Sequence, residues 1–153
     1  MEKIDKNALA RRQGSGYPSP FDGPCRERVR QALGDAARLT DFGVNLLTLP
    51  PGTWSSQRHW HSTEDEFVMV LAGEVVLVTD AGEELLRAGD CAAFPAGDPD
   101  GHHVINRGAS DAVLLEVGTR QADDRTVYSD IDMVAEPGEQ VFRHRDGSPY
   151  PEA

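Results

Sequence analysis

Residues Gly52 to Gly73 read GTWSSQRHWHSTEDEFVMVLAG, and this stretch decides which fold the chain adopts. Its middle carries two histidines one residue apart, and its end is an apolar run that begins at Glu66. Side chains alternate between the two faces of a β-strand, so His59 and His61 share one face while Trp60 points to the other. The stretch therefore predicts two short strands joined by a turn.

The apolar run has two faces, and each is apolar enough to be buried. A two-residue period divides its first six residues into Glu66, Val68 and Val70 on one face and Phe67, Met69 and Leu71 on the other. If Glu66 shares the interior with the histidines, the outward face is apolar and gives a physical motive for a homodimer. By the same alternation Arg58 and Trp60 point away from the histidine side, where we expect packing or subunit contact.

Short runs rich in Val, Leu and Ile continue beyond this stretch, and Gly, Pro and Asp divide them at close intervals. This texture is typical of an all-β sandwich or barrel. A jelly-roll barrel suits eight short strands better than an open sheet, because an open sheet leaves unprotected edges. The predicted strands are Val44–Leu49, Gln57–His61, Glu66–Leu71, Glu74–Thr79, Glu83–Arg87, Cys91–Phe94, His102–Asn106 and Ala112–Val117.

We assign residues 42–120 to the barrel, and the flanking segments differ from it in composition. Residues 1–41 begin with a stretch rich in Gly, Pro, Ser and charge, which favours extended or turn conformations and predicts an N-terminal arm. Within this arm, residues 25–37 fit either a short helix or an edge strand. Residues 121–153 return to charge, Gly and Pro, and we expect a C-terminal tail that packs on the barrel or on a partner subunit.

Length and charge exclude several classes of partner. The chain has 153 residues, 39% of them hydrophobic, and a formal net charge of −11. This size suits one domain with one core. An acidic surface repels nucleic-acid phosphates and anionic lipids, so we expect no nucleic acid and no membrane partner. The N-terminus has no apolar signal region and no stretch approaches about 20 apolar residues, so we expect a soluble cytoplasmic protein.

The two cysteines and His144 predict little chemistry. Cys25 and Cys91 are too few for a disulfide framework and lie in no paired spacing, so we expect reduced thiols. Cys91 opens the apolar run CAAF, where we expect a small buried strand residue. For His144, near the C-terminus, we expect a surface position rather than a role as an acid or base.

The other four histidines fall into two clusters. His59 and His61 together with Glu66 supply two nitrogens and one carboxylate, the ligand set preferred by Fe(II), Mn(II), Ni(II), Co(II) or Zn(II). A fourth ligand comes from His102 or His103, which stand at the start of a later strand. The pattern predicts a metal site and leaves the choice of the fourth ligand open.

Two segments resemble the two motifs of the cupin superfamily. Gly52–Gly73 is similar to the first motif, G-x5-H-x-H-x(3,4)-E-x6-G, and Gly89–Asn106 (GDCAAFPAGDPDGHHVIN) is similar to the second, G-x5-P-x-G-x2-H-x3-N. Six residues rather than five separate Gly52 from His59, and four rather than two separate Gly97 from His102. The resemblance covers roughly the middle half of the chain.

The resemblance implies a small single-domain bacterial cupin. Its fold would be an all-β jelly-roll barrel, or double-stranded β-helix, with N- and C-terminal extensions, and it would form a homodimer. The spacing to Asn106 favours His102 over His103, so the implied ligands of one divalent transition metal (Zn, Mn, Fe, Ni or Co) are His59, His61, Glu66 and His102. The candidates that would orient the imidazoles are Asn106, Glu64 and Asp65.

The cupin fold does not determine function, because this superfamily hosts isomerases, epimerases, dioxygenases, decarboxylases and sensors. Our first hypothesis is a metal-dependent enzyme that acts on a small oxygen-rich molecule; the chain resembles bacterial cupins described as sugar-phosphate isomerase-like. Its phosphate would rely on Arg87, Arg107 or Arg120. The second hypothesis is an Fe(II)-dependent dioxygenase, which the apolar residues Val68 and Val70 favour. The third is a non-catalytic sensor of a small-molecule ligand, and the sequence itself identifies no catalytic residue.

Overall fold

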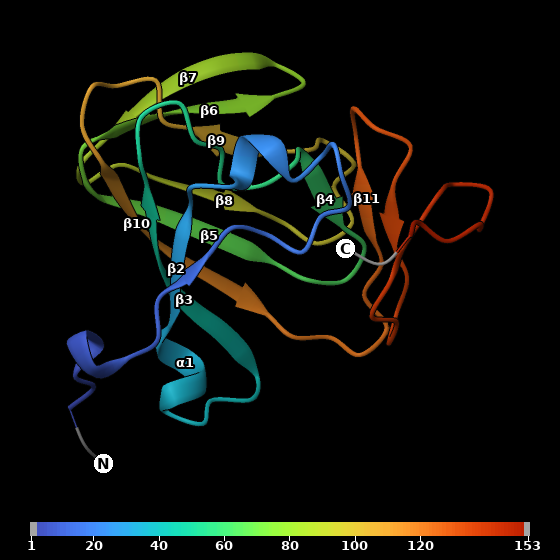
Figure 1. Ribbon diagram of the computed structural model, residues 1–153, viewed down its shortest axis with the longest axis horizontal. Helices are drawn as coiled ribbons and strands as arrows, with labels where there is room; N and C mark the ends of the chain where they lie inside the picture. The colour runs from blue at the N-terminus through green and yellow to red at the C-terminus, as the bar shows by residue number, and fades with distance from the viewer. Residues whose placement is uncertain (1–2, 152–153) are drawn as a thin grey trace.

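The computed structural model describes residues 3–151, which consist almost wholly of strands and loops (Figure 1). No helix among these residues has the length and hydropathy needed to cross a membrane. Within residues 3–151 the helical elements are two 3-10 turns, Lys6–Ala8 and Gly23–Cys25, and the single-turn helix α1, Leu33–Ala36. The strands are β1 (Arg12–Gln13), β2 (Val29–Ala32), β3 (Phe42–Leu49), β4 (His59–His61), β5 (Glu66–Ala72), β6 (Glu74–Thr79), β7 (Gly82–Arg87), β8 (Cys91–Phe94), β9 (His103–Ile105), β10 (Ala112–Thr119), β11 (Thr126–Tyr128), β12 (Val134–Ala135) and β13 (Phe142–Arg143).

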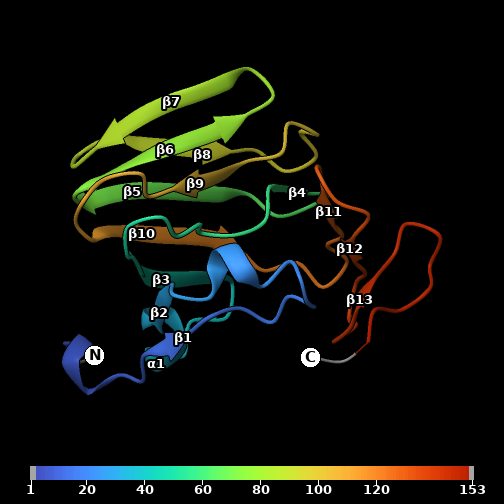
Figure 2. The ribbon, with the colours of Figure 1, turned by 45° about the horizontal axis from the view of Figure 1, so that its top comes forward.

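The described part of the chain forms three antiparallel sheets (Figure 2). The largest has six strands in the order β1-β2-β3-β10-β5-β8, and a three-stranded sheet, β7-β6-β9, packs over it. The third sheet, β13-β12-β11-β4, stands at one end of the molecule. All eight predicted strands are present, with ends that differ by at most two residues. The predicted all-β fold class is confirmed, and the sheet arrangement is consistent with a jelly roll.

The core lies between the six-stranded and the three-stranded sheets. Val70 on β5 is opposite Leu114 on β10, which in turn is opposite Leu47 on β3, and all three side chains are fully buried. The predicted alternation along β5 is therefore confirmed, and its outward face ends in Leu71, which is 46% exposed. Burial of each large aliphatic side chain contributes about 1.5–3 kcal/mol. The buried core consists of Leu47, Leu49, Val70, Val75, Leu77, Leu86, Val104, Ala112 and Leu114.

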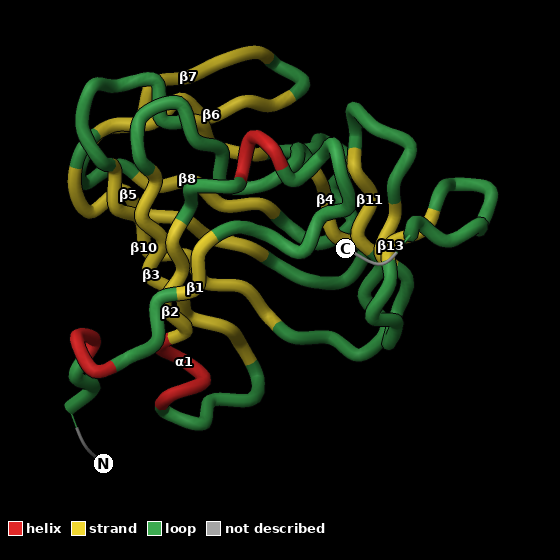
Figure 3. The backbone as a smooth tube through the Cα atoms, viewed as in Figure 1, coloured by secondary structure: helices red, strands yellow, loops and turns green. Residues whose placement is uncertain are grey.

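The flanking segments add strands to the barrel. Residues 25–37, which fit either a helix or a strand, contain both β2 and α1. Between β1 and β2 the N-terminal segment crosses to the neighbourhood of β11, where the Tyr17 and Tyr128 rings meet edge-on with centroids 5.6 Å apart (Figure 1). The C-terminal segment, mostly loops in Figure 3, contributes β11, which pairs with β4 so that Thr126 lies opposite His61.

The predicted burial of Cys91 is wrong. Cys91 is exposed, while its neighbours Ala92 and Phe94 face the interior, where Ala92 pairs with Val68 and Phe94 with Glu66. A run of four apolar residues shows that a strand forms but not which of its two faces turns inward. Neither cysteine is in a disulfide, as expected.

Candidate metal centre

Three imidazoles converge on one carboxylate oxygen at the end of the barrel. β4 carries His59 and His61, β5 begins with Glu66, and His102 stands just before β9, where its backbone forms a bridge with that of His59. The Nε2 atoms of His59 and His61 each lie 3.4 Å from Glu66 Oε2, and His102 Nε2 lies 2.8 Å from the same oxygen. The pairing of distant strands thus brings together all four predicted ligands.

This geometry fits a transition-metal ion. Two ligand atoms that are each about 2.0–2.2 Å from an ion stand about 3.0–3.5 Å apart. The distances between Glu66 and the two histidines of β4 fall in this range, and the ligand atoms of these three residues all lie within 4.8 Å of one another. His102 lies outside that group of three and joins the cluster through its hydrogen bond to Glu66. Imidazole and carboxylate donors together suit Zn, Mn, Fe, Ni or Co.

Hydrogen bonds at the opposite ring nitrogens set the tautomers of the two β4 histidines. His59 Nδ1 lies 2.8 Å from the carbonyl oxygen of Gln57, so Nδ1–H donates and Nε2 keeps its lone pair. His61 Nδ1 lies 2.6 Å from Asp124 Oδ2 and donates to it in the same way. In their neutral forms both rings therefore turn an unprotonated Nε2 towards the cluster, the arrangement usual for metal-binding histidines.

Asp124, which no sequence pattern had marked, orients the His61 ring. It stands two residues before β11, and its Oδ1 accepts the backbone N–H of Thr63 at 2.9 Å. Burial raises the pKa of Asp124, but the hydrogen bonds from His61 and Thr63 outweigh burial and hold that pKa below its usual value. The carboxylate is therefore ionised at neutral pH, the form that binds an imidazole N–H most strongly.

The residues predicted to orient the imidazoles have other partners. The Asn106 side chain is fully buried and donates to the carbonyl oxygen of Leu49 at 2.6 Å, so it braces the barrel. Asp65 accepts a backbone N–H from the loop after β8 at 2.8 Å. Glu64 Oε2 lies 3.8 Å from His61 Nδ1, beyond hydrogen-bond range.

Packing positions His102, whereas His103 points elsewhere. The His102 ring stacks on Phe94 with centroids 3.5 Å apart and an interplanar angle of 1°. Its Nδ1 is buried and has no hydrogen-bond partner among residues 3–151. His103 Nδ1 lies 2.9 Å from the carbonyl oxygen of Ser56, and the ring meets Trp54 edge-on at 4.7 Å. The structure thus places His102, and not its neighbour, beside the other three residues.

Burial and the neighbouring charges shift the pKa values of three residues in the cluster. Burial lowers the pKa of His59, but the hydrogen bond and the charge of Glu66 outweigh burial and raise it. Burial raises the pKa of Glu66, yet hydrogen bonds from His102 and His59 hold it well below its usual value. Burial lowers the pKa of His102. At neutral pH Glu66 is therefore ionised and His102 neutral, which are the forms that bind a metal.

His61, Glu64 and Glu66 line two cavities next to the cluster. The aromatic cavity, of about 190 Å³, is also lined by Trp60, Phe94, His102, Asp98 and Asp100. The arginine cavity, of about 320 Å³, is also lined by Tyr17, Arg28, Arg30, His59, Glu116 and Arg120.

The structure also gives the surroundings of the other side chains for which the sequence predicted a role. Trp60, expected in packing or subunit contact, lines the aromatic cavity, while Arg58 forms ion pairs with two aspartates. Of the arginines predicted to hold phosphate, Arg120 lines the arginine cavity, but Arg107 pairs with Glu83 and Arg87 is exposed at the end of β7. His144 is hydrogen-bonded to Asp132 at 2.9 Å and lines neither cavity.

Comparison with known proteins agrees with this architecture. The Cupin domain family matches residues 45–118. A crystal structure of a sugar phosphate isomerase of the cupin superfamily from Silicibacter pomeroyi superposes on this structure with a TM-score of 0.92. The two sequences are 47% identical, and the match covers 98% of this chain and 97% of the Silicibacter chain. A candidate sugar phosphate isomerase from Acidithiobacillus ferrooxidans is 28% identical over 83% of this chain and 82% of its own, with a TM-score of 0.72.

More distant structures share the fold alone. A predicted oxalate decarboxylase from Thermotoga maritima is 22% identical, covers 78% of this chain and all 100% of its own, and has a TM-score of 0.64. A search of curated proteins finds no match. The extent and identity of the Silicibacter match show that this chain belongs to the cupin superfamily.

Proposed function

We propose that this cupin is a metal-dependent enzyme that acts on a small oxygen-rich molecule of the sugar-phosphate type. Its single divalent transition ion would be held by His59, His61, Glu66 and His102. The observation that supports this most directly is the convergence of three imidazole Nε2 atoms on Glu66 Oε2, at 2.8–3.4 Å. The name of the Silicibacter relative, a sugar phosphate isomerase, supports the substrate class.

An ion in this position would act as a Lewis acid and polarise a carbonyl group of the substrate. The residues of the chain itself divide the remaining tasks. Asp124 keeps the proton of His61 on Nδ1, so that Nε2 faces the cluster. Glu64 lines both cavities and is the side chain we assign to accept a proton from carbon. Burial raises the pKa of Glu64 and outweighs the Gln121 N–H that lowers it, which brings the carboxylate closer to the strength of a useful base.

Solvent exchange tests this proposal across a whole class of sugars at once. The metal-loaded protein is incubated in D2O with a panel of aldose and ketose phosphates, and proton NMR follows deuterium entry at the carbon beside the carbonyl. We expect metal-dependent exchange with at least one sugar phosphate, and its loss in Glu64→Gln with metal content unchanged. Asp123→Asn is the matched control. Binding of the sugar phosphates without any exchange would instead indicate a non-catalytic sensor.

The apolar lining next to the cluster favours an Fe(II)-dependent dioxygenase as the second candidate. Val68, Phe94 and Val104 line a small space that also touches His59 and His102. An apolar wall suits dioxygen chemistry because it excludes water from reactive intermediates. Iron as the bound metal, together with substrate-dependent oxygen consumption, would favour this candidate over isomerisation.

We also propose that the outer face of the six-stranded sheet forms a homodimer contact. Phe42 and Leu71 are 40% and 46% exposed on this sheet, and Phe67 and Met69 share the outward face of β5 with Leu71. Exposed apolar area of this kind marks interaction surfaces. Light scattering coupled to size exclusion should give twice the monomer mass, and Leu71→Lys should lower it; a monomeric wild type would contradict the proposal.

A further inference from the structure

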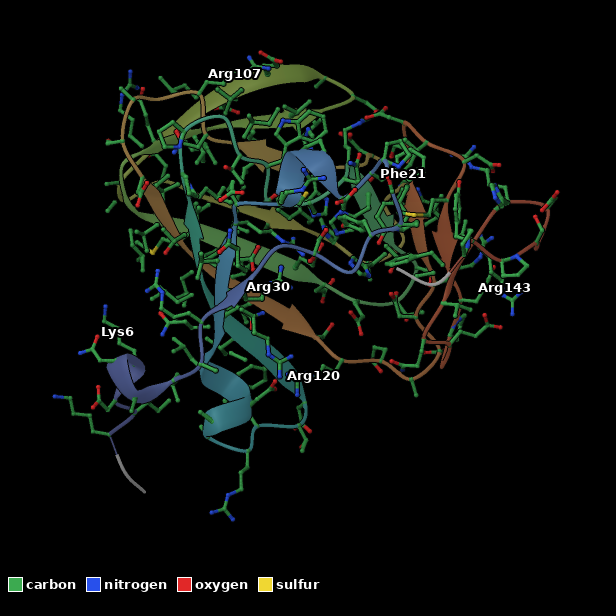
Figure 4. All side chains as sticks on the ribbon, in the orientation of Figure 1. Lys6, Phe21, Arg30, Arg107, Arg120 and Arg143 are labelled. Atoms are coloured by element: carbon green, nitrogen blue, oxygen red, sulfur yellow. The ribbon has the colours of Figure 1, made fainter. Side chains whose placement is uncertain are left out.

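Three arginines surround the cavity on one side of the metal cluster. Arg28 precedes β2, Arg30 lies within it, and Arg120 follows β10, and all three line the arginine cavity together with His59 and Glu66. In Figure 4, Arg30 and Arg120 lie on the same side of the molecule, whereas Arg107 lies far from them near β7. The volume of about 320 Å³ suits a small ligand.

The strand register explains why Arg30 points inward. Arg30 is opposite Leu47 on β3, and Leu47 is fully buried, so both side chains are on the inner face of the sheet. Four residues before Leu47 on β3, Gly43 is opposite Gly118 of β10, which is opposite Glu66. A Cβ atom at Gly118 would stand 3.7 Å from Glu66 Cγ, so two adjacent glycines keep open the space between the arginines and the cluster.

Arg30 has hydrogen-bond donors to spare. Its Nε is buried and has no hydrogen-bond partner among residues 3–151. Its Nη2 lies 3.2 Å from Glu116 Oε2, an ion-pair distance, but that oxygen is itself buried and also lacks a hydrogen bond within this range of residues. A buried donor without a partner is costly, so a ligand that accepts from Arg30 would gain an unusually favourable contact.

The other two arginines already have partners and contribute mainly charge. Arg28 is 8% exposed, donates from Nε to the carbonyl of Gly14 at 2.9 Å, and holds the carbonyl of Ser55 with Nη1. Arg120 Nη1 donates to the carbonyl of Leu39 at 3.1 Å, and Nη2 pairs with Asp35. They fix the N-terminal segment and α1 at the edge of the cavity.

The charge of the cavity also points to an anion. Three arginines and three glutamates (Glu64, Glu66 and Glu116) line it, so its formal charge is zero within a chain of net charge −11. A divalent ion held by the cluster would raise this formal charge to +2. A phosphate monoester carries about −1.5 to −2 at pH 7 and offers three acceptor oxygens to a guanidinium group.

We infer that the arginine cavity is the subsite for the phosphate group of the substrate, with Arg30 as its direct contact. This inference rests on the proposed function, since it takes the sugar part of the same substrate to lie at the metal cluster. The cluster side of the cavity then holds the reacting carbonyl, and the β2 side holds the phosphate.

Calorimetric titration with inorganic phosphate tests the inference. The protein is titrated both metal-loaded and metal-free, and Arg30→Met is compared with wild type and with Arg107→Met, which removes an arginine outside the cavity. We expect Arg30→Met to weaken phosphate binding at least about tenfold in both forms, because it deletes charge-assisted hydrogen bonds. Arg107→Met should bind as wild type does. Arg30→Lys, which keeps the charge but loses the planar donor fork, should be intermediate.

The outcomes separate this inference from the metal proposal. Metal content is measured for every variant, and urea denaturation checks that each is folded. Equal phosphate affinity in wild type and Arg30→Met would overturn the inference and place phosphate on the metal alone, while the metal site itself would stand. Absence of phosphate binding to wild type at millimolar concentrations would also overturn it. Tighter binding of acetate than of phosphate would overturn the phosphate assignment in favour of a carboxylate.

Discussion

Replacement of Asp124 by asparagine removes one charge and almost no volume. Asp124 Oδ2 accepts from His61 Nδ1 at 2.6 Å, and Oδ1 accepts from the backbone N–H of Thr63 at 2.9 Å. An asparagine side chain has one oxygen and one NH₂ group, so one of these two donors loses its acceptor. If Thr63 keeps the oxygen, the NH₂ group faces His61. The ring then carries its proton on Nε2, where it has no lone pair for a metal.

We expect Asp124→Asn to weaken metal binding about 10- to 100-fold, the usual effect of removing the partner of a metal-bound histidine. Competition with a chromophoric chelator measures the Kd, and urea denaturation of the metal-free protein checks the fold. Asp123→Asn is the matched control, because Asp123 contacts the Thr63 hydroxyl at 3.4 Å rather than an imidazole. A folded Asp124→Asn protein whose Kd is within about twofold of wild type would refute the role assigned to this carboxylate.

Three further predictions concern pH, the core and the thiols. The pKa of His59 is raised in the metal-free protein, so below that pKa an entering ion must displace a proton from the ring. The apparent metal affinity should therefore increase with pH up to the pKa of His59 and level off above it. Chelator competition from pH 5 to 8 measures this affinity, and an affinity that does not change with pH would contradict the prediction. Leu114→Ala should lower the free energy of unfolding by about 3 kcal/mol, because Leu114 is fully buried. Leu115 lies on the outer face of β10, so Leu115→Ala should lower the free energy of unfolding by a smaller amount. Urea denaturation measures both changes, and equal losses would mean that the two faces of β10 are assigned wrongly. Iodoacetamide should alkylate exposed Cys91 in the native protein, but Cys25 only after unfolding, since Cys25 is fully buried and burial raises its pKa to about 11. Mass spectrometry of the labelled peptides identifies which thiol reacts, and labelling of Cys25 before Cys91 in the native protein would contradict the prediction.

The central strands and the ligand cluster follow from local sequence patterns. Alternation put His59 and His61 on one face of a strand, but it left open which face of the next strand is buried. The resemblance to the first cupin motif placed Glu66 with the histidines, where the structure has it. The spacing of the second motif favoured His102, and its Nε2 reaches Glu66 at 2.8 Å. These patterns work because a strand fixes the direction of each side chain within a few residues.

Residues contributed by the flanking segments could not be found in this way. Asp124 reaches His61 because β11 pairs with β4, a contact between segments more than 60 residues apart that no local period encodes. Arg30 points inward because β2 continues the register of β3, whereas its composition fitted a helix equally well. Cys91 was assigned to the wrong face because its short apolar run has no polar residue to mark the outside.

The most direct test of the proposed metal centre is elemental analysis of the purified protein beside the double variant His59→Ala, His61→Ala, at matched protein concentration. We predict about one equivalent of Zn, Mn, Fe, Ni or Co in the wild type and its loss in the double variant, because two of the four proposed ligands are gone. Circular dichroism of both proteins would check that the barrel is intact. Absence of metal from the wild type, even after reconstitution with each of these ions, or equal metal content in both proteins, would contradict the metal centre.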